Sequence, residues 1–194
     1  MYSIFELSNS ATLMTLKISE EVSLVEIGIN NYQELYDLMC CVYPPSYQYL
    51  WRDDCSWYLN HVYSREAVVK DINDKGLFCF VVVEGKKKGI LKIQIDQPYP
   101  DQSEVKATRL HRIYLAEEIQ GKGVSKLLMQ FVSNVAKENN SEILWLDCMD
   151  SKQQALKYYI KYGFQKGPLS KLDFELLIDE YRGIYLMWKR IENG

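Results

Sequence analysis

The chain has 194 residues, of which 47% are hydrophobic, and a formal net charge of -3. This length and apolar content predict one domain whose folding buries about 70% of the surface that the unfolded chain exposes. The small negative charge speaks against the basic surface typical of nucleic-acid-binding proteins, and no segment reaches the roughly 18–20 apolar residues of a membrane span.

The first part of the chain has little periodicity. Residues 1–22 are polar and predict either a loosely ordered extension or an early strand, so that residues 23–194 form the single domain. A first strand is expected at 23–29. The asparagines after it would cap a helix, which the prolines at 44–45 end.

An aromatic-rich segment follows the prolines. Tyrosine and tryptophan recur between Tyr47 and Tyr63, and a second helix is predicted over about 55–72. Aromatic residues at helical spacing are typical of a core. Beside Asp53 and Asp54 they also suit a pocket for a cationic amine, because ring faces and carboxylates both attract positive charge.

The rest of the chain alternates strand-like and helix-like segments. Leu91, Ile93 and Ile95 alternate with polar residues as in a half-buried strand, whereas apolar residues from Val124 onward recur at helical spacing. The expected elements are a hairpin with arms 77–83 and 89–95, strands at 107–115, 143–148, 174–178 and 184–189, a helix from 124, and a helix over 152–162 that Gly163 stops. The order β-α-α-β-β-β-α-β-α-β-β predicts an α/β (α+β) three-layer sandwich.

The stretch from Gln120 to Ser125 lies between a predicted strand and the amphipathic helix. A helix whose first turn contains Gly121, Lys122 and Gly123 presents free backbone N–H groups and positive charge to an anion. The stretch fits neither the Gly-x4-Gly-Lys-Ser/Thr pattern nor the Gly-x-Gly-x-x-Gly pattern of nucleotide-binding loops. It predicts either a phosphate-binding turn of another kind or an ordinary flexible turn.

Five cysteines bear on metal binding and on compartment. Their odd number, the lack of a C-x-x-C pair and the presence of only two histidines give little support to a zinc site, so no metal is expected. Cys40, Cys79 and Cys148 lie in apolar runs and predict buried free thiols in a reducing compartment. Because residues 1–9 lack the basic start of a signal peptide, the expected location is the cytoplasm.

Three motifs in fixed order are similar to those of one enzyme family. They are a strand that ends Arg112-Ile113-Tyr114-Leu115, then Gln120-Gly121-Lys122-Gly123-Val124, and then Ala155-x-x-Tyr158-Tyr159-x-x-x-Gly163-Phe164. Together they resemble the Gcn5-related N-acetyltransferase (GNAT) family over about residues 24–190. The resemblance implies a mixed, mostly antiparallel central sheet that is splayed between its fourth and fifth strands, and acetyl-CoA (coenzyme A) as co-substrate.

The resemblance also implies roles for particular residues. Ile113, Tyr114 and Leu115 would hydrogen-bond the pantetheine as an added strand does. The pyrophosphate would be held by the backbone N–H groups of Gln120, Gly121, Lys122, Gly123, Val124 and Ser125. Tyr159 matches a catalytic tyrosine near the thioester sulfur, which either protonates the departing thiolate or stabilises the sulfur by a hydrogen bond.

Two positions depart from the family pattern. Ser125 stands where glycine or alanine is usual, and serine is small enough to keep close packing. Lys152 stands where many members have an asparagine that contacts the cofactor. A lysine there would be expected to approach phosphate instead.

The mechanism implied by the resemblance is direct transfer, in which a free amine attacks the thioester carbon. An alkylammonium group has a pKa of ~10.4, so a base or a water chain must first remove a proton. The candidate bases are His111, Glu104, Asp53 and Asp54, and their spacing does not choose among them.

The function implied is acetyl-CoA-dependent N-acetylation of a primary amine on a small molecule, a polyamine or a peptide amino terminus. One alternative is a non-catalytic acyl-CoA-binding module, against which the presence of Tyr159 argues. Another is an interaction protein that uses the aromatic segment 47–63 as a docking patch. No nucleic-acid or membrane partner is expected, and a homodimer, common in the family, is left open.

Overall fold

The computed structural model describes residues 13–100 and 102–192, in which eight strands form one sheet in the order β1-β2-β3-β4-β5-β6-β8-β7. The strands are β1 (Thr15–Lys17), β2 (Val22–Glu26), β3 (Gly76–Val83), β4 (Lys86–Ile95), β5 (Ala107–Leu115), β6 (Ile143–Met149), β7 (Gln165–Lys171) and β8 (Gly183–Arg190). The α-helices are α1 (Tyr32–Val42), α2 (Pro44–Tyr47), α3 (Ser56–Val62), α4 (Arg65–Asn73), α5 (Val124–Glu138) and α6 (Gln153–Lys161). Short 3-10 helices lie at Ile29–Asn31 (η1), Gln48–Leu50 (η2), Glu117–Ile119 (η3) and Asp179–Tyr181 (η4).

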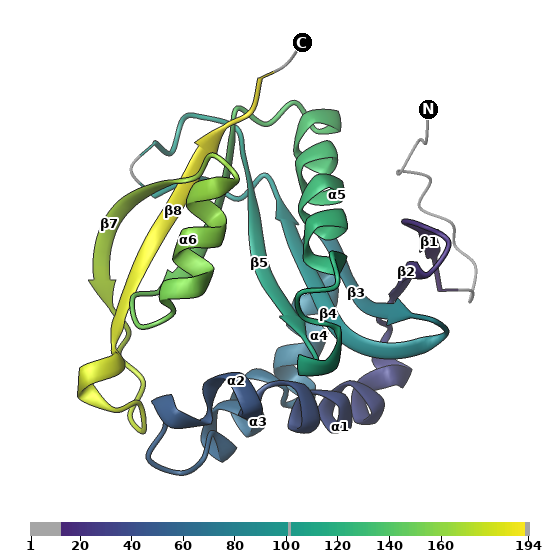
Figure 1. Cartoon of the computed structure of the whole chain (residues 1–194), viewed down its shortest axis with the longest axis vertical. Helices are drawn as coiled ribbons and strands as arrows, with labels where there is room; N and C mark the ends of the chain where they lie inside the picture. Colours follow the sequence, from purple (N-terminus) through teal and green to yellow (C-terminus); the bar gives the residue numbers. More distant parts are fainter. Residues whose placement is uncertain (1–12, 101, 193–194) are drawn as a thin grey trace.

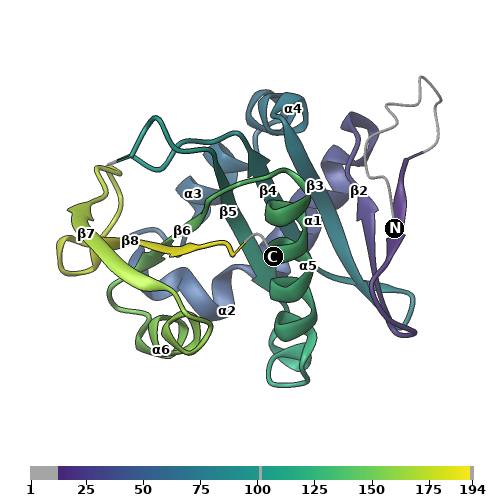
Figure 2. The same ribbon diagram turned by 90° about the horizontal axis from the view of Figure 1, so that it is seen from above.

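The sheet is the middle layer of three. Helices α1 to α4 pack on one face and α5 and α6 on the other (Figures 1 and 2). Because side chains alternate along a strand, Leu91 and Ile93 face α5 while Phe80 and Ile90 pack with α1 to α4. The predicted three-layer sandwich is confirmed. Within the described ranges, no helix is long and apolar enough to cross a membrane.

The sheet opens between β5 and β6. Neighbouring strands are antiparallel except for this pair, which is parallel. Its pairing runs from Ala107 opposite Ile143 to Leu110 opposite Leu146, although β5 continues to Leu115. The strands β5 and β6 correspond to the fourth and fifth strands predicted from the sequence, because β1 precedes the first predicted strand. The predicted mixed, mostly antiparallel sheet with a splay at this point is therefore confirmed (Figure 1).

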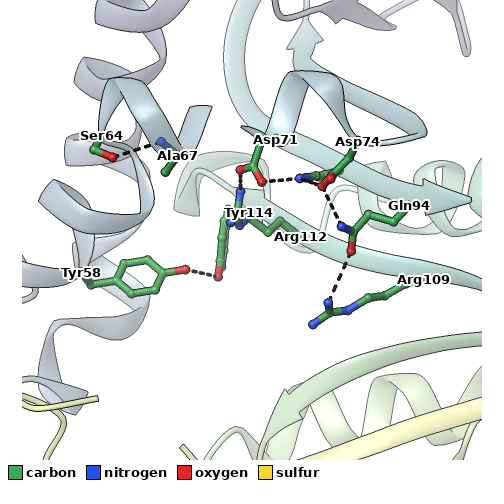
Figure 3. Close-up of polar contacts among 10 residues, drawn as sticks. Tyr58, Ser64, Ala67, Asp71, Asp74, Gln94, Arg109, Arg112 and Tyr114 are labelled. Carbon is green, nitrogen blue, oxygen red and sulfur yellow. Dashed lines mark hydrogen bonds and ion pairs between the residues drawn. The ribbon is translucent and has the colours of Figure 1, made fainter. Parts of the chain in front are cut away.

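The helix predicted over 55–72 is two helices. The first, α3, ends at Val62, and α4 begins at Arg65. The hydroxyl of Ser64 accepts a hydrogen bond of 3.2 Å from the backbone N–H of Ala67, which caps α4 (Figure 3). The continuous apolar spacing concealed this serine cap, and the prediction of one helix is wrong for that reason.

The strand predicted at 174–178 is also wrong. This segment is a loop in which Leu177 is buried and forms an isolated bridge with Trp51. The strand beside β8 is β7, which is polar, mostly exposed and broken in register. An edge strand needs no apolar face, so β7 carries no alternating pattern, and the apolar loop packs instead among the aromatic residues of α1 to α3.

The turn of the first hairpin is tighter than predicted. Glu84 and Gly85 have φ values of 49 and 74, and β4 therefore starts at Lys86 rather than at 89. Two successive residues with positive φ give the turn that matches the twist of a hairpin. Nothing lies within 4 Å of the position that a Cβ on Gly85 would occupy.

The start of the chain contains an early strand. β1 pairs with β2 at the edge of the sheet, which corresponds to one of the two alternatives for residues 1–22. Residues 1–12 lie outside the described residues. The first predicted strand, 23–29, corresponds to β2.

Cysteine burial follows the helix and strand faces. Cys79 and Cys148 are buried, as predicted. Cys40 is exposed, because it lies away from the face of α1 that buries Leu35 and Met39. The prediction of a buried Cys40 was wrong, since an apolar run in a helix does not bury every side chain in it.

Candidate active site

A cavity of about 360 Å³ lies at the splay of the sheet. Its walls include the β5 segment 109–114 and the β6 segment 146–149. Ala155 and Tyr159 contribute from the side of α6, and aromatic residues contribute from the side of α1 to α3. The cavity therefore joins the two faces of the sheet where the strand pairing stops.

The strand β5 has a bulge beside the cavity. Lys92 of β4 pairs with Arg112, but the next residue, Ile93, pairs with Leu110. His111 is the extra residue, and such a bulge bends a strand and redirects its side chains. The bulge lies one residue beyond the last β5–β6 pair, so strand bending accompanies the opening of the sheet.

Tyr159 lines the cavity from α6. Its ring contacts Phe164 edge-on, with centroids 5.7 Å apart, and Tyr158 at 5.6 Å. No hydrogen-bond partner of its hydroxyl is found within the part of the chain that the structure describes. Burial, followed by the nearby Cys148 and Tyr47, raises the pKa of Tyr159 far above its usual value. The group is therefore suited to donate a hydrogen bond and ill suited to release its proton.

The opposite wall is aromatic. The hydroxyls of Tyr58 and Tyr114 are 3.1 Å apart (Figure 3), and the indole N–H of Trp51 donates to the Tyr43 hydroxyl at 3.1 Å. Tyr43 stacks on Tyr58 with centroids 4.4 Å apart. The aromatic segment thus provides core packing and a cavity wall together, because these rings present one face to the core and another to the cavity.

Charged side chains enter the wall from β5 and β6. Arg109 is ion-paired with Asp147, and Arg112 with Asp71 of α4. The lining contains the cations Arg109, Arg112 and Lys152 but one carboxylate, that of Asp147. Sequence reasoning missed Arg109 and Asp147. The available signal was a single carboxylate in the otherwise apolar run 143–148.

The four candidate bases are not brought together. His111 lines the cavity, and burial together with the positive charges beside it lowers its pKa to about 2, so the ring is neutral at pH 7 and a weak base. Glu104 and Asp54 are exposed and absent from the lining. Asp53 instead accepts a hydrogen bond of 2.6 Å from the backbone N–H of Trp57 at the start of α3. Asp53 and Asp54 therefore do not provide the predicted cation pocket.

The N-terminus of α5 has the backbone that an anion site needs. Gly121 and Gly123 have φ values of 75 and 84, a conformation that glycine adopts without strain. Nothing lies within 4 Å of the positions that Cβ atoms on them would occupy. The backbone N–H groups of Gly121, Gly123, Val124 and Ser125 donate to no backbone carbonyl of the described residues. They are free to bind an anion.

A smaller cavity of about 70 Å³ lies between this turn and the splay. Its lining includes Ile113, Tyr114, Leu115 and Gln120, and the Gln120 side-chain amide donates to the Leu115 carbonyl at 2.9 Å. Tyr47 lines both cavities. The residues predicted for pantetheine and pyrophosphate thus follow one another from the splay to α5, the order that a long cofactor with phosphates at one end requires.

Lys152 lies elsewhere than expected. Its ammonium group donates to the Ser46 carbonyl and lies 4.4 Å from the ring centre of Tyr47 and 5.1 Å from that of Tyr49. These contacts are with α2 and η2 rather than with the α5 turn, so the expected approach to phosphate is not seen. Burial lowers the pKa of Lys152 below its usual value.

The fold and site define a class of protein: an α/β sandwich with a splayed sheet, a cavity at the splay and free backbone N–H groups at the start of α5. Within the described residues, no group of three or more His, Cys, Asp or Glu side chains is placed to hold a metal ion. The chain belongs to the acetyltransferase (GNAT) family, whose model matches residues 32–164. Enzymes of this family are acetyltransferases that use acetyl-CoA as the acetyl donor.

Individual relatives agree with this assignment. The chain is 24% identical over 115 residues to an uncharacterized N-acetyltransferase in the pepI 3' region of Lactobacillus delbrueckii subsp. lactis, a match that covers 59% of this chain and 66% of the relative. The match thus spans slightly less than two thirds of that relative.

Two solved structures have a similar fold. PaiA N-acetyltransferase from Thermoplasma acidophilum, in complex with coenzyme A, has a TM-score of 0.66 and 16% identity, covering 87% of this chain and 98% of that one. RimL, a ribosomal L7/L12 alpha-N-protein acetyltransferase in complex with coenzyme A, has a TM-score of 0.70 and 15% identity, covering 93% and 100%.

Proposed function

We propose that this chain transfers an acetyl group directly from acetyl-CoA to a primary amine. The cavity that joins the two faces of the splayed sheet carries this proposal, because two substrates entering from opposite faces would meet there. Acetyl-CoA supplies the acetyl group as an activated thioester. The chain supplies binding, orientation and proton positions.

The residues present fit the donor. Free N–H groups and the open left-handed glycines at the start of α5 suit the pyrophosphate, with the exposed Lys122 beside them. Ile113, Tyr114 and Leu115 lie beyond the end of the β5–β6 pairing, so this part of β5 is available to an added strand. Gln120 joins the two parts by its hydrogen bond to β5.

Tyr159 would donate a hydrogen bond to the sulfur, the role that its strongly held proton allows. The acceptor must arrive as the free amine. Asp147, the carboxylate of the lining, and His111 can each receive a hydrogen bond from this amine directly or through water.

Replacement of Tyr159 by phenylalanine tests this function. We expect about a tenfold fall in kcat, the effect of one lost hydrogen bond, with unchanged affinity for coenzyme A. The measurement is thiol release with a panel of amines, and Tyr162→Phe, at the residue that follows the same helix, is the control. Coenzyme A binding by the unmodified protein without release on any amine would favour the non-catalytic module, and full turnover of the variant would remove Tyr159 from the mechanism.

The wall charges disfavour an acceptor with several positive charges. Asp147 pairs with Arg109 and Asp71 pairs with Arg112, which leaves Lys152 as the cation of the lining without an ion-pair partner among the described residues, so a polyamine would meet stronger repulsion than a peptide amino terminus or a small monoamine. RimL, similar in fold, is by its name an acetyltransferase of a protein amino terminus. We therefore infer that the acceptor is a small monoamine or a peptide amino terminus rather than a polyamine.

A panel of amines that differ in charge tests the acceptor class. We expect kcat/KM for a lysine-free peptide with a free amino terminus to exceed that for spermidine by at least about tenfold, a difference of ~1.4 kcal/mol. The preference should shrink at high salt, because screening weakens repulsion by the cavity cations. Equal or better use of spermidine at low salt would show that the wall charges do not select the acceptor. A cytoplasmic location and a homodimer stay predictions.

A further inference from the structure

One cation of the cavity lacks a carboxylate partner. Arg109 and Arg112 are ion-paired with aspartates, but no carboxylate among the described residues lies within ion-pair distance of Lys152. Its ammonium group has one hydrogen bond, to the Ser46 carbonyl, and two aromatic faces beside it. An ammonium group has three protons to donate, so it retains capacity for a further acceptor.

Lys152 and Tyr159 line the same cavity. Lys152 is the residue before α6, Tyr159 lies seven residues further along, and Ala155 between them also lines the cavity. Cys148 of β6 interacts electrostatically with both side chains. Tyr159 is the residue that the proposed function places at the sulfur, so Lys152 lines the same cavity that the sulfur would occupy.

The two groups differ in how readily they give up a proton. Burial raises the pKa of Tyr159 and lowers that of Lys152, because it disfavours the charged form of each. The titratable groups that face Lys152 are Tyr47 and Tyr49 from α2 and η2, and Cys148 from β6. None of them is a carboxylate, so none holds the lysine proton by an ion pair.

We propose that Lys152 is the proton donor to the departing sulfur, an inference that rests on the proposed function. The amine lone pair forms the C–N bond, the C–S bond breaks, and its electron pair goes to sulfur. Lys152 gives one proton to that sulfur, which yields the free thiol of coenzyme A and a neutral lysine. The acceptor nitrogen, which becomes positively charged when the C–N bond forms, releases one proton to water, and the neutral lysine takes up one proton from water, so the sum is amine plus acetyl-CoA giving amide plus coenzyme A.

The first test needs no turnover. Coenzyme A bound to the protein is titrated by the ultraviolet absorbance of its thiolate, in the natural protein, in Lys152→Met and in the exposed α6 control Lys157→Met. A positive charge beside the sulfur stabilises the thiolate, so we expect the acid dissociation constant of the bound thiol to fall about tenfold in Lys152→Met and to stay unchanged in the control. An unchanged constant in Lys152→Met would overturn the proposal.

The second test separates charge from proton transfer. We expect kcat to fall about 30-fold in Lys152→Met, and the fall in kcat at alkaline pH, where the lysine loses its proton, to disappear. Lys152→Arg should restore the thiol titration but not kcat, because arginine keeps its charge and does not give up a proton at these pH values. Restored kcat in Lys152→Arg would contradict proton donation. No thiol release by the natural protein on any amine would instead contradict the proposed function, and the titration would still decide whether Lys152 lies at the sulfur.

Discussion

Replacement of Lys92 by methionine should lower the free energy of unfolding by about 3–5 kcal/mol, the usual cost of removing one partner from a buried ion pair. The Lys92 side chain is 1% exposed and forms ion pairs with Asp71 and with Asp74, the latter at 2.6 Å. Asp71 also pairs with Arg112, and Asp74 accepts from Gln94 at 2.7 Å (Figure 3). Without the lysine, Asp71 keeps only Arg112 as a cationic partner, and Asp74 keeps only its hydrogen bond from Gln94.

Urea unfolding followed by circular dichroism measures this change. Lys75→Met is the matched control, since Lys75 pairs with Asp96 at the surface one residue before β3, and such pairs contribute about 0–1 kcal/mol. Equal midpoints for the two variants would show that the buried network contributes nothing beyond a surface pair.

The same network has a pH signature. Although desolvation opposes it, hydrogen bonds from Lys92 and Gln94 lower the pKa of Asp74 below its usual value. A group with a lowered pKa in the folded state adds stability above its unfolded pKa of ~3.9, and this stability is lost as pH falls through the folded value. The free energy of unfolding should therefore fall less on acidification in Lys92→Met than in the unmodified protein.

The network also connects the helices to the cavity. It runs from α4 through Lys92 and Gln94 of β4 to Arg109 of β5, which donates to the Gln94 side chain (Figure 3). Arg109 in turn pairs with Asp147 of β6. The Arg109–Asp147 pair lies just where the pairing of β5 and β6 ends. Charged and polar side chains thus connect both walls of the opening to α4.

The donor half of the site was predictable from sequence because its residues are local. The glycine turn and the end of β5 lie within thirteen residues of each other, from Ile113 to Ser125, and backbone conformation alone prepares them for phosphate. Their assignment to a cofactor stays a prediction, but the free N–H groups and positive φ values are what the motif requires.

The acceptor half was not predictable in the same way. Its wall pairs residues far apart in sequence, such as Tyr58 with Tyr114 and Arg109 with Asp147. The sequence near Trp51 predicted that Asp53 and Asp54 would contribute the carboxylates of the pocket. The carboxylate that lines the cavity is instead that of Asp147 in β6, about ninety residues later in the chain. Aromatic content can be read from one segment, but the sign of a pocket's charge depends on which strands the fold brings together.

Replacement of Gly123 by valine should weaken coenzyme A binding by about 100-fold, or ~2.7 kcal/mol. Gly123 is the residue before α5 and has a φ of 84, which a β-branched side chain does not tolerate. Relief of this backbone strain would change φ at position 123 and would turn the N–H groups of positions 123 and 124 away from the phosphates. Two charge-assisted hydrogen bonds, at about 1.5–3 kcal/mol each, would be weakened.

The control is Gly85→Val, since Gly85 also has a positive φ, of 74, with nothing within 4 Å of its Cβ position, but lies in the β3–β4 turn. Both variants should lose about 1–2 kcal/mol of stability from the same backbone strain. Titration calorimetry should then show weaker binding of coenzyme A in Gly123→Val alone. Pantetheine, which has no phosphates, should bind equally to both, because it reaches β5 without using the turn. A similar loss of coenzyme A affinity in both variants would mean that strain, and not the phosphate-binding turn, accounts for the effect.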